Sequence, residues 1–186
     1  MINRYVTGEF DKTVPNFKDF TLDLVVDGAK VSLGIWDYAP EDDSGWEERL
    51  RSLSYFNADV HVLCFSLVSE ASLEKGIEQT WLQRVRQHNP AAPVMLVGTK
   101  LDLRSDETMP REAQWKRAPV SYKRGTAFAR KIGAVGYREC SALTGEGVKD
   151  VFETAVRAAL QYKSRTARGA AHEHQHRTAR KRCVVM

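Results

Sequence analysis

The amino-acid sequence predicts an α/β fold, a three-layer sandwich in which helices cover both faces of a mostly parallel sheet. Residues 61–67 and 93–98 are almost continuously apolar, which is typical of central strands buried on both faces. Between these runs, an apolar residue recurs at every fourth position, as in a helix that crosses between two strands. The four residues are Leu73, Ile77, Trp81 and Val85. Strands that alternate with helices in this way form a parallel sheet.

The remaining elements follow in order along the chain. Residues 21–36 alternate apolar and polar side chains on either side of Asp27-Gly28, which predicts a β-hairpin with a tight turn. After a polar stretch, a short helical pattern ends near Gly133. A short strand around residues 137–140 and a helix over about residues 148–160 then complete the predicted fold.

Length and composition indicate one core-bearing domain, residues 1–162, followed by a tail, residues 163–186. The 186 residues include 42% hydrophobic and 28% charged residues, an ordinary globular composition. No apolar run could span a membrane or serve as a secretory signal, so we expect a cytosolic chain. The three cysteines do not form a disulfide framework. We expect Cys64 and Cys140 to be small buried hydrophobes.

The positive charge of the chain is concentrated in the tail. Residues 163–182 contain seven Lys or Arg and one acidic residue, whereas the rest of the chain carries a small negative charge. The tail also lacks apolar periodicity, which predicts disorder. A basic tail on a mildly acidic body suggests an anionic partner for the tail, either a membrane or a nucleic acid.

The segment "VGTKLDLR" (residues 97–104) has the chemistry of a guanine-reading loop. The Asp102 carboxylate can accept two parallel hydrogen bonds from the guanine edge, which adenine cannot offer. The alkyl stem of Lys100, after Thr99, can lie along the flat face of the base. Ser141 and Ala142 follow the next predicted strand, where backbone N–H groups could reach the guanine carbonyl. A T-K-x-D tetrapeptide alone is a weak signal, and a solvated turn is the alternative.

Six segments in the same order resemble the Rho family of Ras-like small GTPases over nearly the whole chain. They are "DGAKVSLGIWD", "RLRSLSY", "CFSLVSEASLE", "VGTKLDLR", "GAVGYRECSALTGEGVKDVF" and "CVVM". The resemblance implies a P-loop NTPase fold of the Ras type and GTP/GDP with Mg²⁺ as ligands. It also implies GTP hydrolysis as the activity, Rho-type effectors and regulators as partners, and a role in actin organisation and polarity.

The family's phosphate-binding motif, G-x-x-x-x-G-K-[ST], does not occur in this sequence. Residues 1–10 resemble the end of the helix that follows that motif in the family. We therefore expect the first strand and the phosphate loop to be missing, either because the sequence is incomplete or because the domain evolved without them. The missing strand would leave two rows of backbone groups without partners, and such a chain should fold poorly alone.

The switch segments also depart from the family pattern. Where the family has D-x-x-G-Q, this chain reads Asp37-Tyr38-Ala39-Pro40-Glu41. Pro40 has no N–H for a phosphate, and the negative Glu41 cannot donate a hydrogen bond. Gly45 is an alternative match for the missing glycine. Asn16 stands after a proline where the family has a magnesium-binding Thr. We therefore predict no metal site, and Asp37 is the only doubtful candidate for a metal ligand. We also predict that GTP hydrolysis is very slow or absent.

The terminal "RKRCVVM" resembles a prenylation signal, with Cys183 as the lipidated residue and Met186 favouring a farnesyl group. One lipid chain holds a membrane only marginally. Four basic residues can add an electrostatic attachment to anionic lipids: Arg177, Arg180, Lys181 and Arg182. We therefore expect the chain on the cytoplasmic side of a membrane, the plasma membrane in particular, with a cytosolic pool.

Three functions remain as hypotheses. The first is a lipid-anchored Rho-like switch protein that binds guanine nucleotide when complete and hydrolyses it poorly. The second is a membrane-tethered adaptor that has lost nucleotide binding and acts through protein contacts. The third, a nucleic-acid binder, is disfavoured because the positive charge lies in a tail that ends in a prenylation signal.

Overall fold

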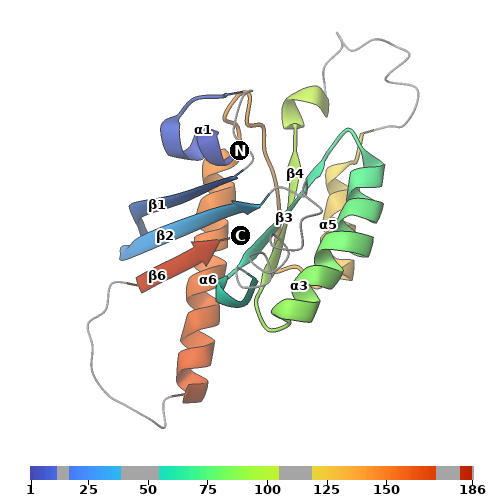
Figure 1. The fold of residues 1–186 in the computed structure, drawn as a ribbon. Helices are drawn as coiled ribbons and strands as arrows, with labels where there is room; N and C mark the ends of the chain where they lie inside the picture. Colours follow the sequence, from blue (N-terminus) through green and yellow to red (C-terminus); the bar gives the residue numbers. More distant parts are fainter. Residues whose placement is uncertain (12–16, 39–54, 105–118, 171–180, 186) are drawn as a thin grey trace.

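The structure, a computed structural model, describes residues 1–11, 17–38, 55–104, 119–170 and 181–185 (Figure 1). The strands are β1 (Phe17–Val26), β2 (Ala29–Tyr38), β3 (His61–Ser66), β4 (Val94–Thr99), β5 (Gly136–Glu139) and β6 (Lys181–Val185). The α-helices are α1 (Ile2–Thr7), α3 (Leu82–His88), α5 (Tyr122–Lys131) and α6 (Val148–Ala170). A π-helix, η1 (Ser72–Trp81), precedes α3, and a 3₁₀-helix, η2 (Leu101–Arg104), follows β4. No helix in the described ranges is long and apolar enough to cross a bilayer.

Strands β1 and β2 form the predicted hairpin, and it is longer than expected. The two strands pair antiparallel from Phe17–Tyr38 to Val26–Ala29. Asp27 and Gly28 both have positive φ angles, 50° and 78°, as a two-residue type I′ turn requires. The buried face of β2 carries Val31, Leu33 and Ile35.

Strands β3, β4 and β5 form the predicted parallel sheet in that spatial order. The helix that joins β3 to β4 begins as η1 and continues as α3. Its apolar residues are four apart, whereas an ideal α-helix turns every 3.6 residues, so the stripe would drift around the helix. The wider i→i+5 turns of η1 offset this drift, and Leu73, Ile77 and Val85 are all buried.

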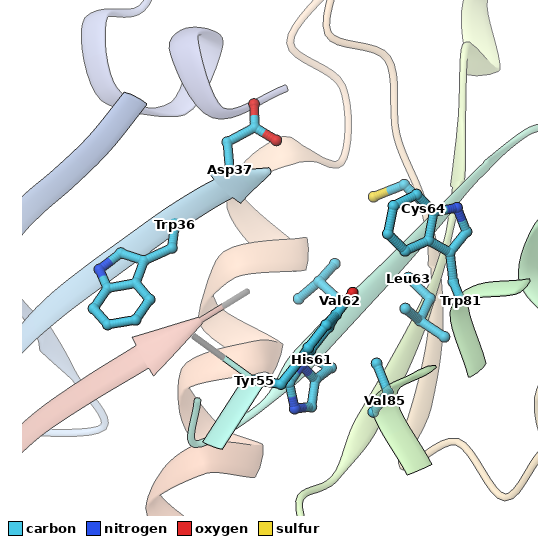
Figure 2. A pocket seen from close by; sticks show the side chains of 9 residues that line it. All are labelled: Trp36, Asp37, Tyr55, His61, Val62, Leu63, Cys64, Trp81 and Val85. Atoms are coloured by element: carbon cyan, nitrogen blue, oxygen red, sulfur yellow. The ribbon is translucent and has the colours of Figure 1, made fainter. Parts of the chain in front are cut away.

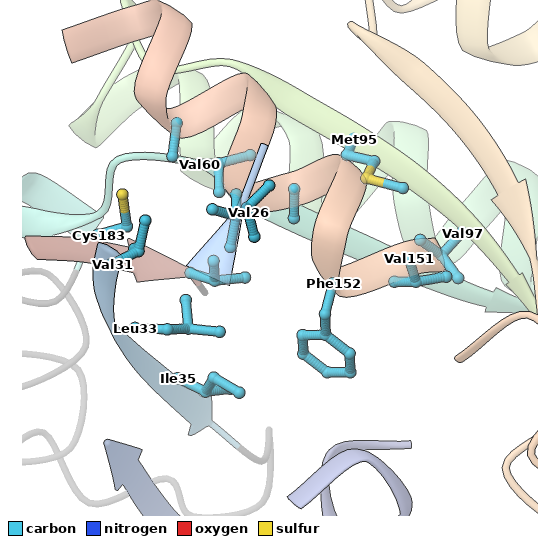
Figure 3. Close-up of a cluster of buried hydrophobic side chains, with 14 of the residues drawn as sticks. Val26, Val31, Leu33, Ile35, Val60, Met95, Val97, Val151, Phe152 and Cys183 are labelled. Carbon is cyan, nitrogen blue, oxygen red and sulfur yellow. The ribbon is translucent and has the colours of Figure 1, made fainter. Parts of the chain in front are cut away.

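Two hydrophobic cores, one on each face, make the fold a three-layer sandwich. On one face, α1 and α6 pack over the hairpin, with Phe152 of α6 near Leu33 and Ile35 (Figure 3). On the other face, η1, α3 and α5 cover β3 and β4. The predicted fold class is therefore confirmed.

The prediction of a disordered tail from residue 163 is wrong for the described part of the tail. Helix α6 continues to Ala170, and residues 181–185 form β6, which pairs parallel with β2. Strand β6 also touches β3 through a bridge between Val60 and Val185. It therefore fills part of the slot between β2 and β3, which the sequence analysis had expected to leave two unpaired rows of backbone groups.

Candidate functional site

The loops after β4 and β5 meet at the carboxyl ends of their strands, where ligands bind in parallel sheets. Two backbone hydrogen bonds join the loops: Cys140 N donates to Gly98 O at 2.8 Å, and Leu101 N donates to Cys140 O at 3.1 Å. Thr99 anchors the end of β4, because its hydroxyl donates to Phe65 O at 2.9 Å. Lys100 then takes a left-handed conformation, with φ 62°, which is uncommon for a residue with a side chain. The chain thereby turns sharply into η2, which carries Asp102.

Asp102 and Ser141 are brought together although they lie in different loops. The hydroxyl of Ser141 donates a hydrogen bond to Oδ1 of Asp102 and accepts one from Thr144 N at 3.1 Å. Ser141 is fully buried, whereas Asp102 is half-buried. The buried hydroxyl therefore fixes the direction of the carboxylate while part of Asp102 still faces solvent.

The expected N–H donors of residues 141 and 142 are only partly in place. Ser141 N already donates to Glu146 O at 2.9 Å, which closes the loop on itself. Ser141 therefore contributes its hydroxyl rather than its N–H. The half-buried Ala142 remains as the candidate backbone donor for a guanine carbonyl.

An ion pair behind these loops joins η2 to β5, and the sequence analysis missed it. Arg104 donates to both carboxylate oxygens of Glu139, at 2.5 and 2.6 Å, and to Val120 O at 2.7 Å. Tyr137 Oη donates to Glu139 at 2.6 Å, and burial followed by this hydrogen bond raises the pKa of Tyr137. Arg104 follows Asp102 by two residues and Glu139 precedes Ser141 by two, so the pair holds both halves of the site. Nothing in one sequence marks two such distant residues as partners.

The second half of the site lies between β2 and β3, where the sheet has an opening. Strand β6 pairs with β2 only as far as Ile35. Beyond it, a cavity of about 250 Å³ lies on each face of the sheet. Four residues line both cavities: Trp36, Asp37, Val62 and Cys64. Figure 2 shows Trp36 and Asp37 on β2 at one side of this opening, and Val62 and Cys64 of β3 at the other.

Cys64 corrects the prediction that both early cysteines are buried. It is exposed, because it lies on the face of β3 that borders the opening, whereas Cys140 is buried as predicted. Burial raises the pKa of the Cys140 thiol to about 11. Trp36 and Trp81 also border the opening and are half-buried.

The described part of the opening does not fit a magnesium–phosphate site. Its single carboxylate is Asp37, and its other lining residues are mostly apolar. Within the described ranges, no group of three His, Cys, Asp or Glu residues could hold a metal ion. Desolvation raises the pKa of Asp37, which opposes the charged form that a metal needs. Asn16, Pro40, Glu41 and Gly45 lie outside the described residues.

Two comparisons with known proteins identify the family of this chain. The Ras family model matches residues 1–161. The chain is also 40% identical over 182 residues to the GTP-binding protein RHO1 of Saccharomyces cerevisiae, an alignment that covers 96% of this chain and 85% of that protein. The chain belongs to the Rho family of Ras-like small GTPases.

Membership of the Rho family implies general ligands and partners for the chain. Proteins of this family bind guanine nucleotides and act in signalling with regulators and effectors. The loops that carry Asp102 and Ser141 are the parts of this Rho-family chain whose geometry suits the guanine base.

Proposed function

We propose that this Rho-family chain is a membrane-tethered signalling protein that recognises guanine through Asp102 and hydrolyses GTP very slowly or not at all. One observation carries the proposal: the Asp102 carboxylate is held by the buried hydroxyl of Ser141 at the meeting point of two loops. A preorganised carboxylate loses little freedom when it binds a base. The surrounding ion pair of Arg104 and Glu139 keeps the loops in register.

Slow hydrolysis is supported by the sequence of the second switch. Pro40 cannot donate an N–H to a terminal phosphate. Glu41 stands where the family has a glutamine that orients the attacking water, and its negative charge repels the phosphate. The sequence also contains no G-x-x-x-x-G-K-[ST] motif to hold the phosphates. On this proposal, binding energy comes from the base and little comes from the phosphates.

Calorimetry with nucleosides and nucleotides tests this proposal on the 186-residue chain. We expect guanosine to bind and adenosine not to bind, and we expect guanosine, GDP and GTP to have affinities within about threefold, since tenfold would need about 1.4 kcal/mol from the phosphates. A chain that binds GTP far more tightly than guanosine would contradict the loss of the phosphate site. A chain that binds neither would contradict guanine recognition.

The variant Asp102→Asn sharpens the same test. An amide donates where the carboxylate accepts, so guanosine affinity should fall at least about tenfold. Xanthosine, which presents a carbonyl in place of the guanine amino group, should gain affinity. Asp19→Asn is the matched control, because Asp19 is an exposed residue of β1. Equal losses of guanosine affinity in both variants would indicate general damage to the folded chain rather than the loss of a contact with the base.

Membrane attachment through Cys183 is the second part of the proposal. The Cys183 sulfur would displace diphosphate from a prenyl diphosphate, forming a thioether while the thiol proton leaves to solvent. The basic residues of the tail, Arg177, Arg180, Lys181 and Arg182, would add attraction to the anionic cytoplasmic face of the plasma membrane. Part of the protein would remain in the cytosol, because one lipid chain anchors only marginally.

Farnesyl transfer and vesicle binding test this attachment. Incubation with farnesyl diphosphate and a farnesyltransferase should add one farnesyl group, and Cys183→Ser should remain unmodified. The modified chain should bind phosphatidylserine vesicles more tightly than neutral vesicles, and added salt should weaken that binding. A chain that stays unmodified even when Cys183 is accessible would contradict the anchor.

A membrane-tethered adaptor without nucleotide binding is the second candidate function. It is favoured by the mostly apolar lining of the opening. This candidate predicts that guanosine does not bind and that Asp102→Asn leaves binding to Rho-type effectors unchanged. The calorimetry described above separates the two candidates directly.

A further inference from the structure

Strand β6 occupies a central position in the molecule although it comes from the end of the chain. It pairs parallel with β2, with Val31 opposite Lys181 and Ile35 opposite Val185. On its other side, Val185 forms an isolated parallel bridge with Val60, the residue directly before β3. In Figure 1, β6 lies beside β2 and in front of α6, between the hairpin and the rest of the sheet. The C-terminal segment therefore links two sheets that are otherwise separate.

Both faces of β6 are buried by apolar neighbours. Cys183 and Val185 belong to the core cluster that α6 covers, together with Leu33, Ile35 and Phe152 (Figure 3). Val184 points to the opposite face, over Gly34, where a Cβ would meet the Val184 methyl at 3.8 Å. Cys183 is fully buried. Such alternate burial on two faces is typical of a central strand rather than of a loosely attached tail.

Asp59 holds β6 against the start of β3. Its backbone N–H donates to Val184 O at 2.9 Å, and its carboxylate accepts from Val184 N at 2.8 Å. Val60 N adds a longer bond to the same carbonyl at 3.3 Å. The Asp59 carboxylate also pairs with Lys163 of α6 at 3.0 Å. The Asp59 carboxylate therefore accepts the Val184 N–H, which a backbone carbonyl would accept if β3 were longer.

We propose that the slot between β2 and β3 is a strand-binding site whose occupant is the chain's own segment 181–185, and that docking of this segment shields Cys183. Docking and chemical modification at Cys183 then exclude each other, because a buried thiol inside a paired strand cannot reach a second molecule. The segment must leave the slot before Cys183 can react.

The covalent link to α6 keeps the segment close to the slot after it leaves. Ten residues separate Ala170 from Lys181, and a short tether of this kind gives an effective concentration in the millimolar range. Release and rebinding can therefore occur within one molecule. A free peptide of the same sequence would compete only at similar concentrations.

Thiol labelling of the full chain tests the proposal. We would use a Cys64→Ser background, because Cys64 is exposed and would react on its own. Cys140 is buried in the same core but follows β5, which does not pair with β6, and it reports global unfolding. We expect both Cys140 and Cys183 to be protected from a maleimide. Labelling of Cys183 at the rate of a free peptide, with Cys140 still protected, would overturn the proposal.

The variant Asp59→Ala should release β6 selectively. Loss of a hydrogen bond to a charged acceptor corresponds to about tenfold or more in an equilibrium, so Cys183 should label at least about tenfold faster while Cys140 stays protected. Asp59→Asn keeps an acceptor for Val184 N and should have a smaller effect. Asp19→Ala, on the exposed edge of β1, is the matched control and should leave both rates unchanged. Equal rates in Asp59→Ala and Asp19→Ala would contradict the role given to Asp59 in docking.

If Asp59→Ala unfolds the whole chain, a disulfide cross-link between β2 and β6 tests the docking of β6 instead. Leu33 lies directly opposite Cys183, and paired residues in adjacent strands are close enough for a disulfide. Under mild oxidation, Leu33→Cys should form a disulfide with Cys183, located by mass spectrometry, and the same variant with Cys183→Ser should form none. Absence of the Leu33→Cys to Cys183 disulfide in a folded chain would overturn docking.

The consequence for lipidation rests on the proposed function and can be judged separately. If Cys183 is a prenylation site, farnesyl transfer should be slow in the unaltered chain and at least about tenfold faster in Asp59→Ala. Equal transfer rates would contradict the shielding of Cys183. No transfer to either chain, together with a protected Cys183 thiol, would refute the membrane anchor while leaving the docked strand intact.

Discussion

The two halves of the sheet, β3–β5 on one side and the β1–β2 hairpin on the other, are connected to their neighbouring strands in different ways. Strands β3, β4 and β5 are joined to each other by helices that cross between them, and the loops at their ends carry Asp102 and Ser141. Strands β1 and β2 are a local hairpin, and their link to β3 is a strand from the far end of the chain. The first half is thus self-contained, whereas the second depends on the C-terminus. We therefore expect the loops that carry Asp102 and Ser141 to remain ordered even when β6 leaves its slot.

The largest expected effect comes from Val185→Asp, which places a charge in the core between the two halves. Val185 is buried between β2 and β3, and an unpaired buried charge is strongly destabilising. We expect the free energy of unfolding to fall by about 4 kcal/mol, measured by urea denaturation. Val25→Asp is the matched control, because Val25 is 64% exposed. Similar losses in both variants would show that β6 contributes little to joining the halves.

A second effect concerns His61, at the start of β3 beside the junction. Burial, together with the nearby charge of Arg86, lowers the pKa of His61 to about 4. Above pH 6.5 the imidazole of His61 is neutral in both the folded and the unfolded chain. As the pH falls towards 4, this imidazole becomes protonated in the unfolded chain but stays neutral in the folded chain. The free energy of unfolding should therefore fall by about 3 kcal/mol over this range.

Denaturation at a series of pH values measures the effect of His61. His61→Leu should lose this pH dependence between 6.5 and 4, whereas His88→Asn should retain it. A wild-type chain with constant stability over this range would contradict the burial of a neutral His61. If Cys183 is labelled faster over the same pH range in which stability is lost, then protonation of His61 also releases β6.

The smallest effect is expected within the self-contained half. Arg104→Met leaves Glu139, whose side chain is 9% exposed, without its cationic partner. We expect a loss of about 2 kcal/mol in the free energy of unfolding and weaker guanosine binding, because η2 and β5 lose their link. Arg124→Met removes an exposed pair with Glu74 and should cost less than about 0.5 kcal/mol. Equal effects would mean that the Arg104 pair does not position the loops.

The sequence predicted the elements that depend on local patterns. Asp27-Gly28 encodes its own turn, and the four-residue spacing of Leu73, Ile77 and Val85 encodes a helix face. The loops of Asp102 and Ser141 were found because each follows an apolar strand in a parallel sheet. Their hydrogen bond follows from the parallel order of β4 and β5.

The elements that depend on distant partners could not be predicted. The valines of "CVVM" fit a prenylation signal and a buried strand equally well, and only the slot beside β2 shows that they pair as a strand. Cys64 was expected to be buried because its strand is apolar on both faces. Its exposure depends on how far β6 extends along the neighbouring slot, which no local pattern records.

The position of β6 also has a consequence for biosynthesis. Val31 pairs with Lys181, so the hairpin is made long before its partner strand. Contacts between residues so far apart in sequence form slowly. Until residues 181–185 have been made, the nascent chain exposes the unpaired edge of β2, a surface prone to aggregation. Newly made molecules should therefore depend on a chaperone more than their small size suggests.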